Sequence, residues 1–399
     1  MGQKIAVTGM GIISSIGNNV EENFSSLISK KHGISDIEIL QTRFAGQLKL
    51  GEIKITNEEL IQELGLSPEN NCTRTTLLGM IALREAIESS GITNINEYPT
   101  GLISSTSVAG MDVTEKYFFN YEEHPEQQKY IHSHDAGVSS LQLADFIGLK
   151  GMVSTISTAC SSAANAIMMG AKLIKSGVLD RVIVGGTDSL SKFTLNGFNS
   201  LMIITDTYNT PFDNNRKGLN LGEAAAFLVL ESEELVKKEN KKVLAYLTGY
   251  GNANDAHHQT ASSENGQGAY LAMKKALEVS GIAKEDVDYI NVHGTATPNN
   301  DFAEGTAMLR IFGEENVPDF SSTKAFTGHT LAAAAGIEAV YSILSLQRNI
   351  IYPNLNFKDK MEEFNLIPVT EVKEKPIQNV LSNSFGFGGN CSTLIFSKS

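Results

Sequence analysis

The chain has 399 residues, of which 41% are hydrophobic and 19% are charged. This composition is typical of a globular protein with two domains or one large duplicated domain, and it excludes disordered and collagen-like chains. Lys and Arg number 32 against 45 Asp and Glu, so the net charge is −13, which argues against nucleic-acid binding because phosphate contacts need clustered cations.

The three cysteines, Cys72, Cys160 and Cys391, lie far apart and form no CxxC pair. An odd, dispersed set argues against a disulfide framework or a structural zinc site and is typical of a reducing compartment. The start, MGQKIAVTGM, lacks the basic-then-apolar pattern of a signal peptide, and no apolar run approaches the ~18 residues of a membrane span. We therefore expect a soluble, cytoplasmic protein without membrane insertion.

Apolar, strand-like runs alternate with helical patterns along the chain, which predicts an α/β fold. The clearest runs are IAVTGMGI at 5–12, RVIVGG at 181–186, AAAFLVL at 224–230 and VLAYLTGYG at 243–251. The charged run ESEELVKKENKK at 231–242 indicates a solvated helix and a seam between two halves. We place these halves at 1–235 and 236–399.

The two halves resemble one another in three places, always in the same order. The paired segments are 4–11 with 243–251, 155–177 with 321–346, and 181–190 with 379–389. In the second pair, a polar turn carries a reactive residue and then opens an Ala-rich helix. This pattern predicts a duplicated fold in which matching turns from both halves surround one central cleft.

Cys160 lies in STACSSAANAIMMGAKLIKSG, where apolar residues recur at helical spacing from Ile167 to Ile174 and Gly177 ends the pattern. The cysteine therefore stands at or just before a helix N-terminus, where free amides and the helix dipole favour a thiolate. An isolated cysteine is more often a buried, unreactive side chain. The polar setting and two histidines further along the chain favour a nucleophile instead.

Those histidines lie at polar turns in the second half. The strand-like YINV leads to His293 in HGTATPNND, and His329 lies in STKAFTGHT before an Ala-rich helix. Lys324 precedes His329 by five residues, and Glu338 follows it by nine. A lone histidine is more often structural than catalytic, but two in Gly/Thr turns, together with a helix-capping cysteine, predict a catalytic group.

The segment NSFGFGGNCSTLIF at 383–396 is glycine-rich before the last strand-like run. Its glycines permit positive φ, so backbone amides can face a ligand, and Phe385 and Phe387 form an apolar gate or wall. A simple glycine-rich hairpin is the alternative interpretation.

Other motifs lack the required residues. Ser14 stands where a dinucleotide-binding fingerprint beginning at Gly9 has glycine, no Walker loop or GxSxG motif is present, and metal-ligand spacing is lacking at His132/His134 and His257/His258. We therefore expect no bound metal and no cofactor.

Four motifs together resemble the β-ketoacyl-acyl-carrier-protein synthases, in the synthase II branch with a Cys-His-His triad. They are TACSSA around Cys160, HGTATPNND at His293, STKAFTGHT with Lys324 and His329, and the FGFGG loop. The resemblance runs from the first strand to the last. It implies a thiolase fold, with two βαβαβαββ halves in a five-layered αβαβα arrangement, a tight homodimer, and a decarboxylating Claisen condensation that lengthens an acyl chain by two carbons.

The resemblance also implies roles for the reactive residues. Cys160 would take the acyl chain, and the amides of Cys160 and Phe385 would form the oxyanion hole. His293 and His329 would hold the malonyl thioester oxygen while CO₂ leaves. Substrates would arrive on the phosphopantetheine arm of acyl-carrier protein, with no cofactor bound to the chain itself.

Further residues match supporting and substrate-binding positions of that family. Lys324, paired with Glu338, would support the site electrostatically, and Phe385 would be a gate that swings on acyl loading. The substrate-binding positions are Thr295 and Thr297 for the phosphopantetheine arm and Val108, Phe198 and Phe387 around the acyl chain.

The sequence departs from the housekeeping members in two motifs and at the carrier-docking positions. FGFGGTN is replaced by FGFGGNC, with Asn390 and Cys391, and LGAAGG is replaced by LAAAAG. Asn71 and Met202 stand where those enzymes place basic residues, which leaves Arg74 as the expected carrier-protein contact. These departures favour a specialised aryl-polyene, flexirubin-like or polyketide pathway.

Two alternatives stay open. A thiolase acting on coenzyme A esters would carry a CxGGG-type motif and a GHP histidine, which this chain lacks; Cys391 is better explained as a small apolar filler. A non-catalytic chain-length-factor subunit would have lost its nucleophile, usually to glutamine, whereas Cys160 is retained. The same residues are also consistent with a heterodimer in which this chain is the active partner of such a subunit.

Overall fold

The computed structural model describes residues 4–119 and 121–399. Residues 1–3, which begin the segment that lacks a signal-peptide pattern, lie outside the described residues. The first half has the order βαβαβαββ in its main elements: β1 (Ile5–Ser14), α3 (Arg74–Ser89), β4 (Thr100–Ser105), α5 (Ala136–Phe146), β5 (Met152–Ile156), α6 (Ser162–Lys175), β6 (Arg181–Asp188) and β7 (Ala224–Ser232).

The second half has the same order. Its main elements are β8 (Ala245–Asn254), α9 (Gln267–Ser280), β9 (Tyr289–Asn291), α10 (Pro298–Phe312), β10 (Asp319–Ser321), α12 (Ala334–Arg348), β13 (Asn379–Phe385) and β14 (Asn390–Ser397). Shorter helices and strands occupy the connections: α1 (Val20–Ile28), β2 (Ser35–Asp36), β3 (Lys49–Leu50), α2 (Asn57–Glu63), α4 (Met111–Tyr117), α7 (Lys192–Ser200), α8 (Glu233–Glu239), α11 (Lys324–Thr327), β11 (Ile350–Ile351) and β12 (Lys373–Glu374).

The strand order confirms the predicted duplication. The strands follow one another as β10-β9-β13-β14-β8-β1-β7-β6-β4-β5, so each strand of one half has a counterpart at the mirrored place in the other. The halves meet where β1 and β8 pair antiparallel over only three residues, from Ile5–Leu247 to Val7–Ala245. The segments 4–11 and 243–251, which resemble one another in sequence, therefore contain the two strands at the centre of the sheet.

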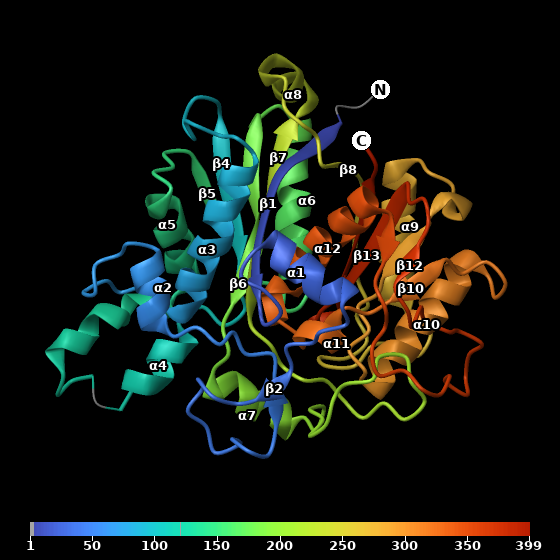
Figure 1. The fold of residues 1–399 in the computed structure, drawn as a ribbon, viewed down its shortest axis with the longest axis horizontal. Helices are drawn as coiled ribbons and strands as arrows, with labels where there is room; N and C mark the ends of the chain where they lie inside the picture. The colour runs from blue at the N-terminus through green and yellow to red at the C-terminus, as the bar shows by residue number, and fades with distance from the viewer. Residues whose placement is uncertain (1–3, 120) are drawn as a thin grey trace.

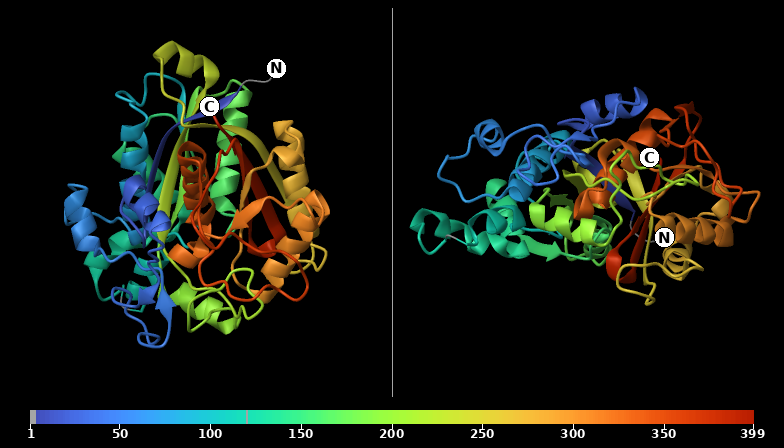
Figure 2. Two further views of the ribbon diagram at one scale, coloured as in Figure 1. Left: turned by 45° about the vertical axis from the view of Figure 1, so that its right-hand side comes forward. Right: turned by 90° about the horizontal axis from the view of Figure 1, so that it is seen from below.

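Helices and sheet form the five predicted layers. Helices α6 and α12 lie between the two halves of the sheet, α3 and α5 cover the outer face of the first half, and α9 and α10 cover the outer face of the second (Figure 1). The turned views in Figure 2 show the same separation of the blue-to-green half from the yellow-to-red half. The turns after β5, β10 and β13 all lie at the end of the molecule away from α8.

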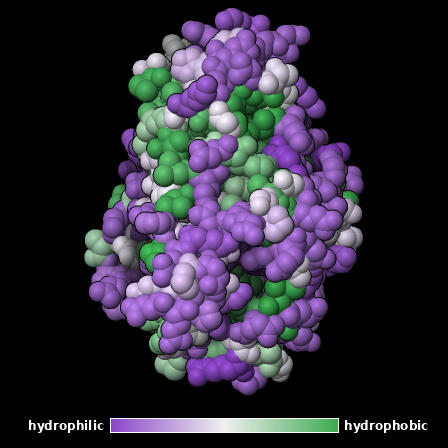
Figure 3. Space-filling model, turned by 90° about the vertical axis from the view of Figure 1, so that its left-hand side faces the viewer, coloured by the Kyte–Doolittle hydropathy of each residue, from purple (hydrophilic) through white to green (hydrophobic). Residues whose placement is uncertain are grey.

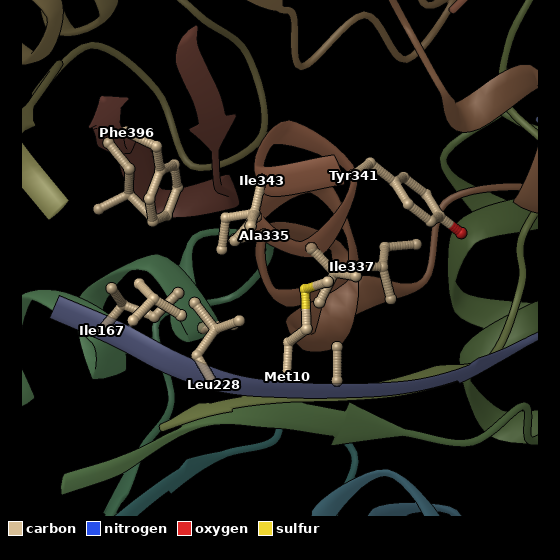
Figure 4. Close-up of a cluster of buried hydrophobic side chains, with 14 of the residues drawn as sticks. Met10, Ile167, Leu228, Ala335, Ile337, Tyr341, Ile343 and Phe396 are labelled. Atoms are coloured by element: carbon tan, nitrogen blue, oxygen red, sulfur yellow. The ribbon is translucent and has the colours of Figure 1, made fainter. Parts of the chain in front are cut away.

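The central layer is built around α12, whose residues Ala334–Leu346 are all buried. A helix that is apolar on every side belongs in an interior. Figure 4 shows Ile337 lying near Met10 of β1, with Ile343 in the same cluster. Glu338 is the exception among these residues: a buried acid in such a helix needs a partner, which makes it a candidate functional group.

The predicted seam at 231–242 contains the end of β7 and all of α8. The proposed boundary between residues 235 and 236 falls inside this helix, and the position of that boundary stays a prediction. Within residues 4–119 and 121–399, no helix combines the length and the apolar character that crossing a bilayer requires.

Candidate active site

Cys160 lies in the tight turn between β5 and α6. The turn is sharp because Ala159 adopts a left-handed conformation with φ +52°, and the Thr158 amide donates a 2.8 Å hydrogen bond to the Ser162 hydroxyl. A non-glycine residue with positive φ is uncommon and marks a constrained backbone. Cys160 stands two residues before the start of α6, where the sequence places it, and its surface is 6% exposed.

His329 lies against the thiol from the opposite half. Its Nε2 is 3.0 Å from Cys160 Sγ, and the Leu331 amide donates to its Nδ1 over 3.2 Å. Because Nδ1 accepts this bond, neutral His329 carries its proton on Nε2. The imidazole therefore presents a hydrogen-bond donor, and not a lone pair, to the centre of the site.

His293 completes the cluster. Its ring centroid is 5.5 Å from that of His329, with the two planes at 88°, and one ligand-type atom from each of Cys160, His293 and His329 lies within 4.8 Å of the others. Such a group has the size of a metal site. The proton on Nε2 of His329 opposes that use, because a metal would need the lone pair of that nitrogen.

Buried charge surrounds the two imidazoles. Lys324 and Glu338 form a buried ion pair, and the Ser384 hydroxyl donates to the second carboxylate oxygen over 3.3 Å. Burial lowers the pKa of His293 and of His329 well below the ordinary value, and the Lys324 cation lowers both further. Both imidazoles are therefore neutral donors at physiological pH.

The thiol is weakly acidic at rest. Burial raises the pKa of Cys160 to about 11, while the Lys324 charge and the backbone amides of Phe387 and of Cys160 itself oppose this rise. The two amides that stabilise negative charge at the sulfur thus come from the nucleophile turn and from the glycine-rich loop after β13. The carbonyl of an acyl group bound to Cys160 would lie next to this sulfur, which makes the two amides candidate donors of an oxyanion hole.

The two phenylalanines of the glycine-rich loop differ in their surroundings. The sequence predicts Phe385 for the second amide and for the gate, and both roles stay predictions; the loop amide that lowers the pKa of the Cys160 thiol is that of Phe387. Phe385 is the last residue of β13, is buried, and packs its ring 5.7 Å from that of His293. Phe387 is half-buried and stacks on Phe198 at 5.7 Å, so it is the better placed of the two to move.

A cavity of about 320 Å³ leads to these groups. Thr295 and Thr297, whose hydroxyls are 2.9 Å apart, line this cavity, and their role in substrate binding stays a prediction. Its lining also includes Phe198, Ile203, Leu219, His258, Asn300, Phe387 and Cys391. Val108 does not line this cavity; it packs, partly buried, in the adjoining apolar cluster that includes Phe198.

Arg74 does not form the predicted carrier contact. Its guanidinium is buried and bonds both carboxylate oxygens of Glu223, at 2.7 and 2.9 Å, while its remaining donors reach Asn57 and the carbonyls of Ile53 and Ile55. All five donors are therefore used within the fold. The prediction is wrong because Arg74 holds the first half together and presents no charge to a partner.

Glu304 on α10 is a further residue of the site, one that no motif of the sequence marks. Its carboxylate accepts the backbone amides of His293 and Gly294, each over 2.9 Å, and the Asn383 amide over 3.0 Å. Burial raises the pKa of Glu304 to about 7. The residue fixes the His293 loop. The only sequence signal was an acidic residue 11 positions after the histidine, in the middle of α10.

Comparisons with known proteins agree with the fold and the site. The family model described as "Beta-ketoacyl synthase, N-terminal domain" matches residues 2–235, and the one described as "Beta-ketoacyl synthase, C-terminal domain" matches residues 244–358. The chain therefore belongs to the β-ketoacyl synthase family, as its motifs predict. The predicted enzyme class, a ketosynthase that elongates acyl chains, is thereby confirmed.

Similar proteins span the whole chain. The 3-oxoacyl-[acyl-carrier-protein] synthase 2 of Vibrio harveyi is 32% identical, with 99% of each chain covered, and that of Staphylococcus aureus (strain COL) is 30% identical, with 99% of this chain and 98% of the relative covered. Among solved structures, the ishigamide ketosynthase/chain length factor has a TM-score of 0.93 at 26% identity, with both chains covered completely. A ketosynthase in complex with its chain length factor from Xenorhabdus doucetiae has a TM-score of 0.87 at 30% identity, with 100% of this chain and 98% of that chain covered. These neighbours confirm the thiolase-type fold.

Proposed function

We propose that this chain condenses a Cys160-bound acyl group with a malonyl thioester, and that both substrates arrive on the phosphopantetheine arm of an acyl-carrier protein. The observation that carries the proposal is the Cys160–His329 contact of 3.0 Å, with the His329 proton directed at the sulfur by the Leu331 amide. The chain therefore brings a nucleophile and a neutral hydrogen-bond donor to one point.

In the first half-reaction, the Cys160 sulfur attacks the acyl thioester carbonyl. The carbonyl oxygen takes up negative charge between the amides of Cys160 and Phe387, which stabilise it without having to reorganise. The carbon–sulfur bond to the carrier then breaks, and the departing pantetheine thiolate takes the proton that the cysteine gives up. The product is an acyl-Cys160 thioester and a free carrier thiol.

In the second half-reaction, a malonyl thioester enters the same site. His293 and His329 donate hydrogen bonds to its thioester oxygen, so that the electron pair released with CO₂ is held as an enolate. The enolate carbon attacks the acyl-Cys160 carbonyl, the bond to the sulfur breaks, and the cysteine thiolate is released to recover its proton. Neutral imidazoles suit this step because protonated ones would be costly to bury.

Lys324 and Glu338 support both half-reactions from behind the imidazoles. The Lys324 charge lowers the pKa of both histidines and of the Cys160 thiol. Glu338 compensates that charge, without which a lone buried cation would be strongly destabilising. We propose no cofactor and no metal for this chemistry.

We assign the pantetheine arm to the cavity wall at Thr295 and Thr297, where two hydroxyls can bond an amide-containing chain. The acyl chain would extend past Phe198 and Phe387 toward the cluster that contains Val108. With Arg74 excluded, no basic residue is proposed as the carrier contact. The specialised pathway and the cytoplasmic location stay predictions.

We propose further that the chain dimerises through β5. In the described residues β5 is an edge strand that pairs only with β4. Its counterpart β10 is the other edge strand, but the Phe320 carbonyl of β10 accepts a hydrogen bond from the Val369 amide. Figure 3 views the molecule from the side of α5 and β5 and shows hydrophobic residues gathered between hydrophilic ones. Leu141 and Met152 are exposed there, and an open apolar edge usually has a partner.

The partner would be a second copy or a chain-length-factor-like subunit. Two of the similar structures carry a chain length factor in their titles, which keeps the second option open. Sedimentation of the purified chain distinguishes the two: a dimer of the chain alone supports the homodimer, and a monomer supports the requirement for a different subunit.

The function is tested by intact-protein mass spectrometry after incubation with saturated, polyunsaturated and aryl-primed acyl-carrier proteins. A mass gain that peptide mapping places on Cys160 supports the proposal, and the preferred acyl group defines the substrate class. The absence of any adduct from every carrier would contradict it.

A further inference from the structure

The glycine-rich loop carries a side chain whose contacts the condensation mechanism does not use. Asn390 ends this loop and begins β14. Its Oδ1 accepts hydrogen bonds from the Ser161 hydroxyl at 2.7 Å, the Asn165 amide at 2.8 Å and the Asn252 amide at 2.9 Å. The first two donors belong to the N-terminal turn of α6, and Ser161 is the residue directly after the nucleophile.

The same asparagine closes the base of the loop through its backbone. The Gly386 amide donates to the Asn390 carbonyl over 2.8 Å, and the Gly389 amide donates to the Gly386 carbonyl over 3.1 Å. Two of the three residues in between need conformations that glycine allows, since Gly388 and Gly389 have φ of +82° and +80°. The Gly388 amide donates to the Gln259 carbonyl over 2.7 Å, and the Asp255 amide donates to the Gly389 carbonyl over 2.8 Å, so these backbone bonds hold the loop to the segment after β8. The Asn390 side chain adds the contact to α6, on the side of the nucleophile.

The fixed side of the contact is the nucleophile turn. Ser161 is fully buried, and Asn165 also donates to the Thr158 hydroxyl over 2.8 Å, so α6 offers rigid partners on both sides of Cys160. The bonds through Asn390 thus join the element that holds the sulfur to the element that holds the opposing amide. A donor that stabilises developing charge must be held within a fraction of an ångström of its productive position.

We propose that Asn390 is a positioning residue for acyl transfer: its side-chain carbonyl fixes the glycine-rich loop against α6 so that the Phe387 amide faces the Cys160 sulfur. The inference rests on the proposed function, because it concerns the oxyanion hole of the acylation step. All three side-chain bonds are accepted by Oδ1, so the role requires a hydrogen-bond acceptor at this position.

The test measures the two half-reactions separately on Asn390→Ala, Asn390→Asp and Asn390→Thr, each as the full-length chain. Acylation is followed as mass gain on Cys160 from octanoyl-pantetheine. Decarboxylation is followed as CO₂ release from malonyl-pantetheine in a Cys160→Gln background. Ser392→Ala is the matched control, because the Ser392 hydroxyl donates to Asn165 in the same polar cluster without touching the loop.

Asn390→Ala is expected to slow acylation about tenfold to a hundredfold, less than the complete loss of an oxyanion-hole donor, and to change decarboxylation less than about twofold. Asn390→Asp keeps the acceptor and is expected to recover most of the acylation rate. Asn390→Thr, which suits the start of a strand, keeps a smaller acceptor and gives an intermediate rate even if the alanine variant does not fold. Ser392→Ala acylates at the wild-type rate.

Wild-type acylation rates in Asn390→Ala or in Asn390→Thr would overturn the inference, and so would parallel losses in both half-reactions, which indicate a purely structural role. Wild-type enzyme is assayed alongside. If it acquires no acyl mass from octanoyl-pantetheine or from any carrier protein, the proposed function itself fails, and the positioning role fails with it.

Discussion

The β5–α6 turn and the β10–α12 turn occupy equivalent places in the two halves but carry different chemistry. The first is short: five residues separate Ile156 from Ser162, and Cys160 stands two residues before the helix. The second is longer and contains α11 and a 3₁₀ turn, so that it brings both Lys324 and His329 to the site. A duplicated scaffold thus provides two facing positions, and the length of each turn decides how many groups it presents.

The two turns share one backbone feature, a non-glycine residue with positive φ. Ala159, directly before Cys160, has φ +52°, and Leu331, two residues after His329, has φ +55°. Non-glycine residues rarely adopt this conformation, and it is retained where the surrounding structure imposes it. In the first turn it allows the sharp change of direction between β5 and α6 at Cys160, and in the second it places the Leu331 amide on Nδ1 of His329. The strain therefore serves orientation in both halves.

The largest effect is expected when the electrostatic support of the longer turn is removed. Lys324→Met leaves Glu338 buried without its partner, which is expected to destabilise the fold by about 3–5 kcal/mol and to abolish decarboxylation. The double variant Lys324→Met/Glu338→Gln removes both charges and is expected to recover much of the stability without recovering activity. Urea unfolding and CO₂ release measure the two effects. Full activity in the double variant would refute the role assigned to the Lys324 charge.

A smaller effect is expected in the pH dependence of folding stability. His293 and His329 have folded-state pKa values well below the 6.5 of the unfolded chain, so the unfolded state binds more protons as the pH falls through 6.5. Their contribution to stability is therefore present above pH 6.5 and declines below it, by up to about 1.4 kcal/mol per pH unit for each group.

Glu304 acts in the opposite direction, because its folded-state pKa is raised to about 7. The histidine contribution is therefore obtained by difference. Thermal unfolding of the wild type and of His293→Ala/His329→Ala, measured from pH 8 to pH 5, should show a wild type that loses more stability on acidification. Identical pH profiles would contradict neutral, buried imidazoles.

The smallest expected effect concerns the cavity wall. Thr297→Val keeps the shape of the side chain but removes a hydroxyl, which is expected to raise KM for a pantetheine thioester about fivefold and to leave kcat unchanged. Ser263→Ala, outside the set of cavity-lining residues, serves as the comparison. A fall in kcat with unchanged KM would place Thr297 in the chemical step and not in binding.

Much of this structure was predictable from local patterns. The duplication, the helix after Cys160 and the turns at His293 and His329 follow from apolar periodicity and from glycine and threonine at the turns, which act over a few residues. These signals also placed the reactive residues in one cleft, because equivalent turns of a duplicated fold lie at the same end of its sheet.

The sequence was least informative where contacts between residues far apart in the chain decide the outcome. Phe385 and Phe387 differ by two residues, so alternation along a strand gives both the same face; only the end of β13 at Phe385 separates a buried ring from a loop amide. Arg74 looks like a surface cation in sequence, but its partner Glu223 is 149 residues away. Neither the difference between the two phenylalanines nor the burial of Arg74 can be deduced from the neighbouring residues in the sequence.

The most direct test of the account measures both half-reactions on Cys160→Gln and on His329→Ala. The account predicts opposite losses: Cys160→Gln takes up no acyl group but still releases CO₂ from a malonyl thioester, whereas His329→Ala is acylated but decarboxylates at least about a hundredfold more slowly. Condensation by Cys160→Gln, or undiminished decarboxylation by His329→Ala, would contradict the division of chemistry between the two halves.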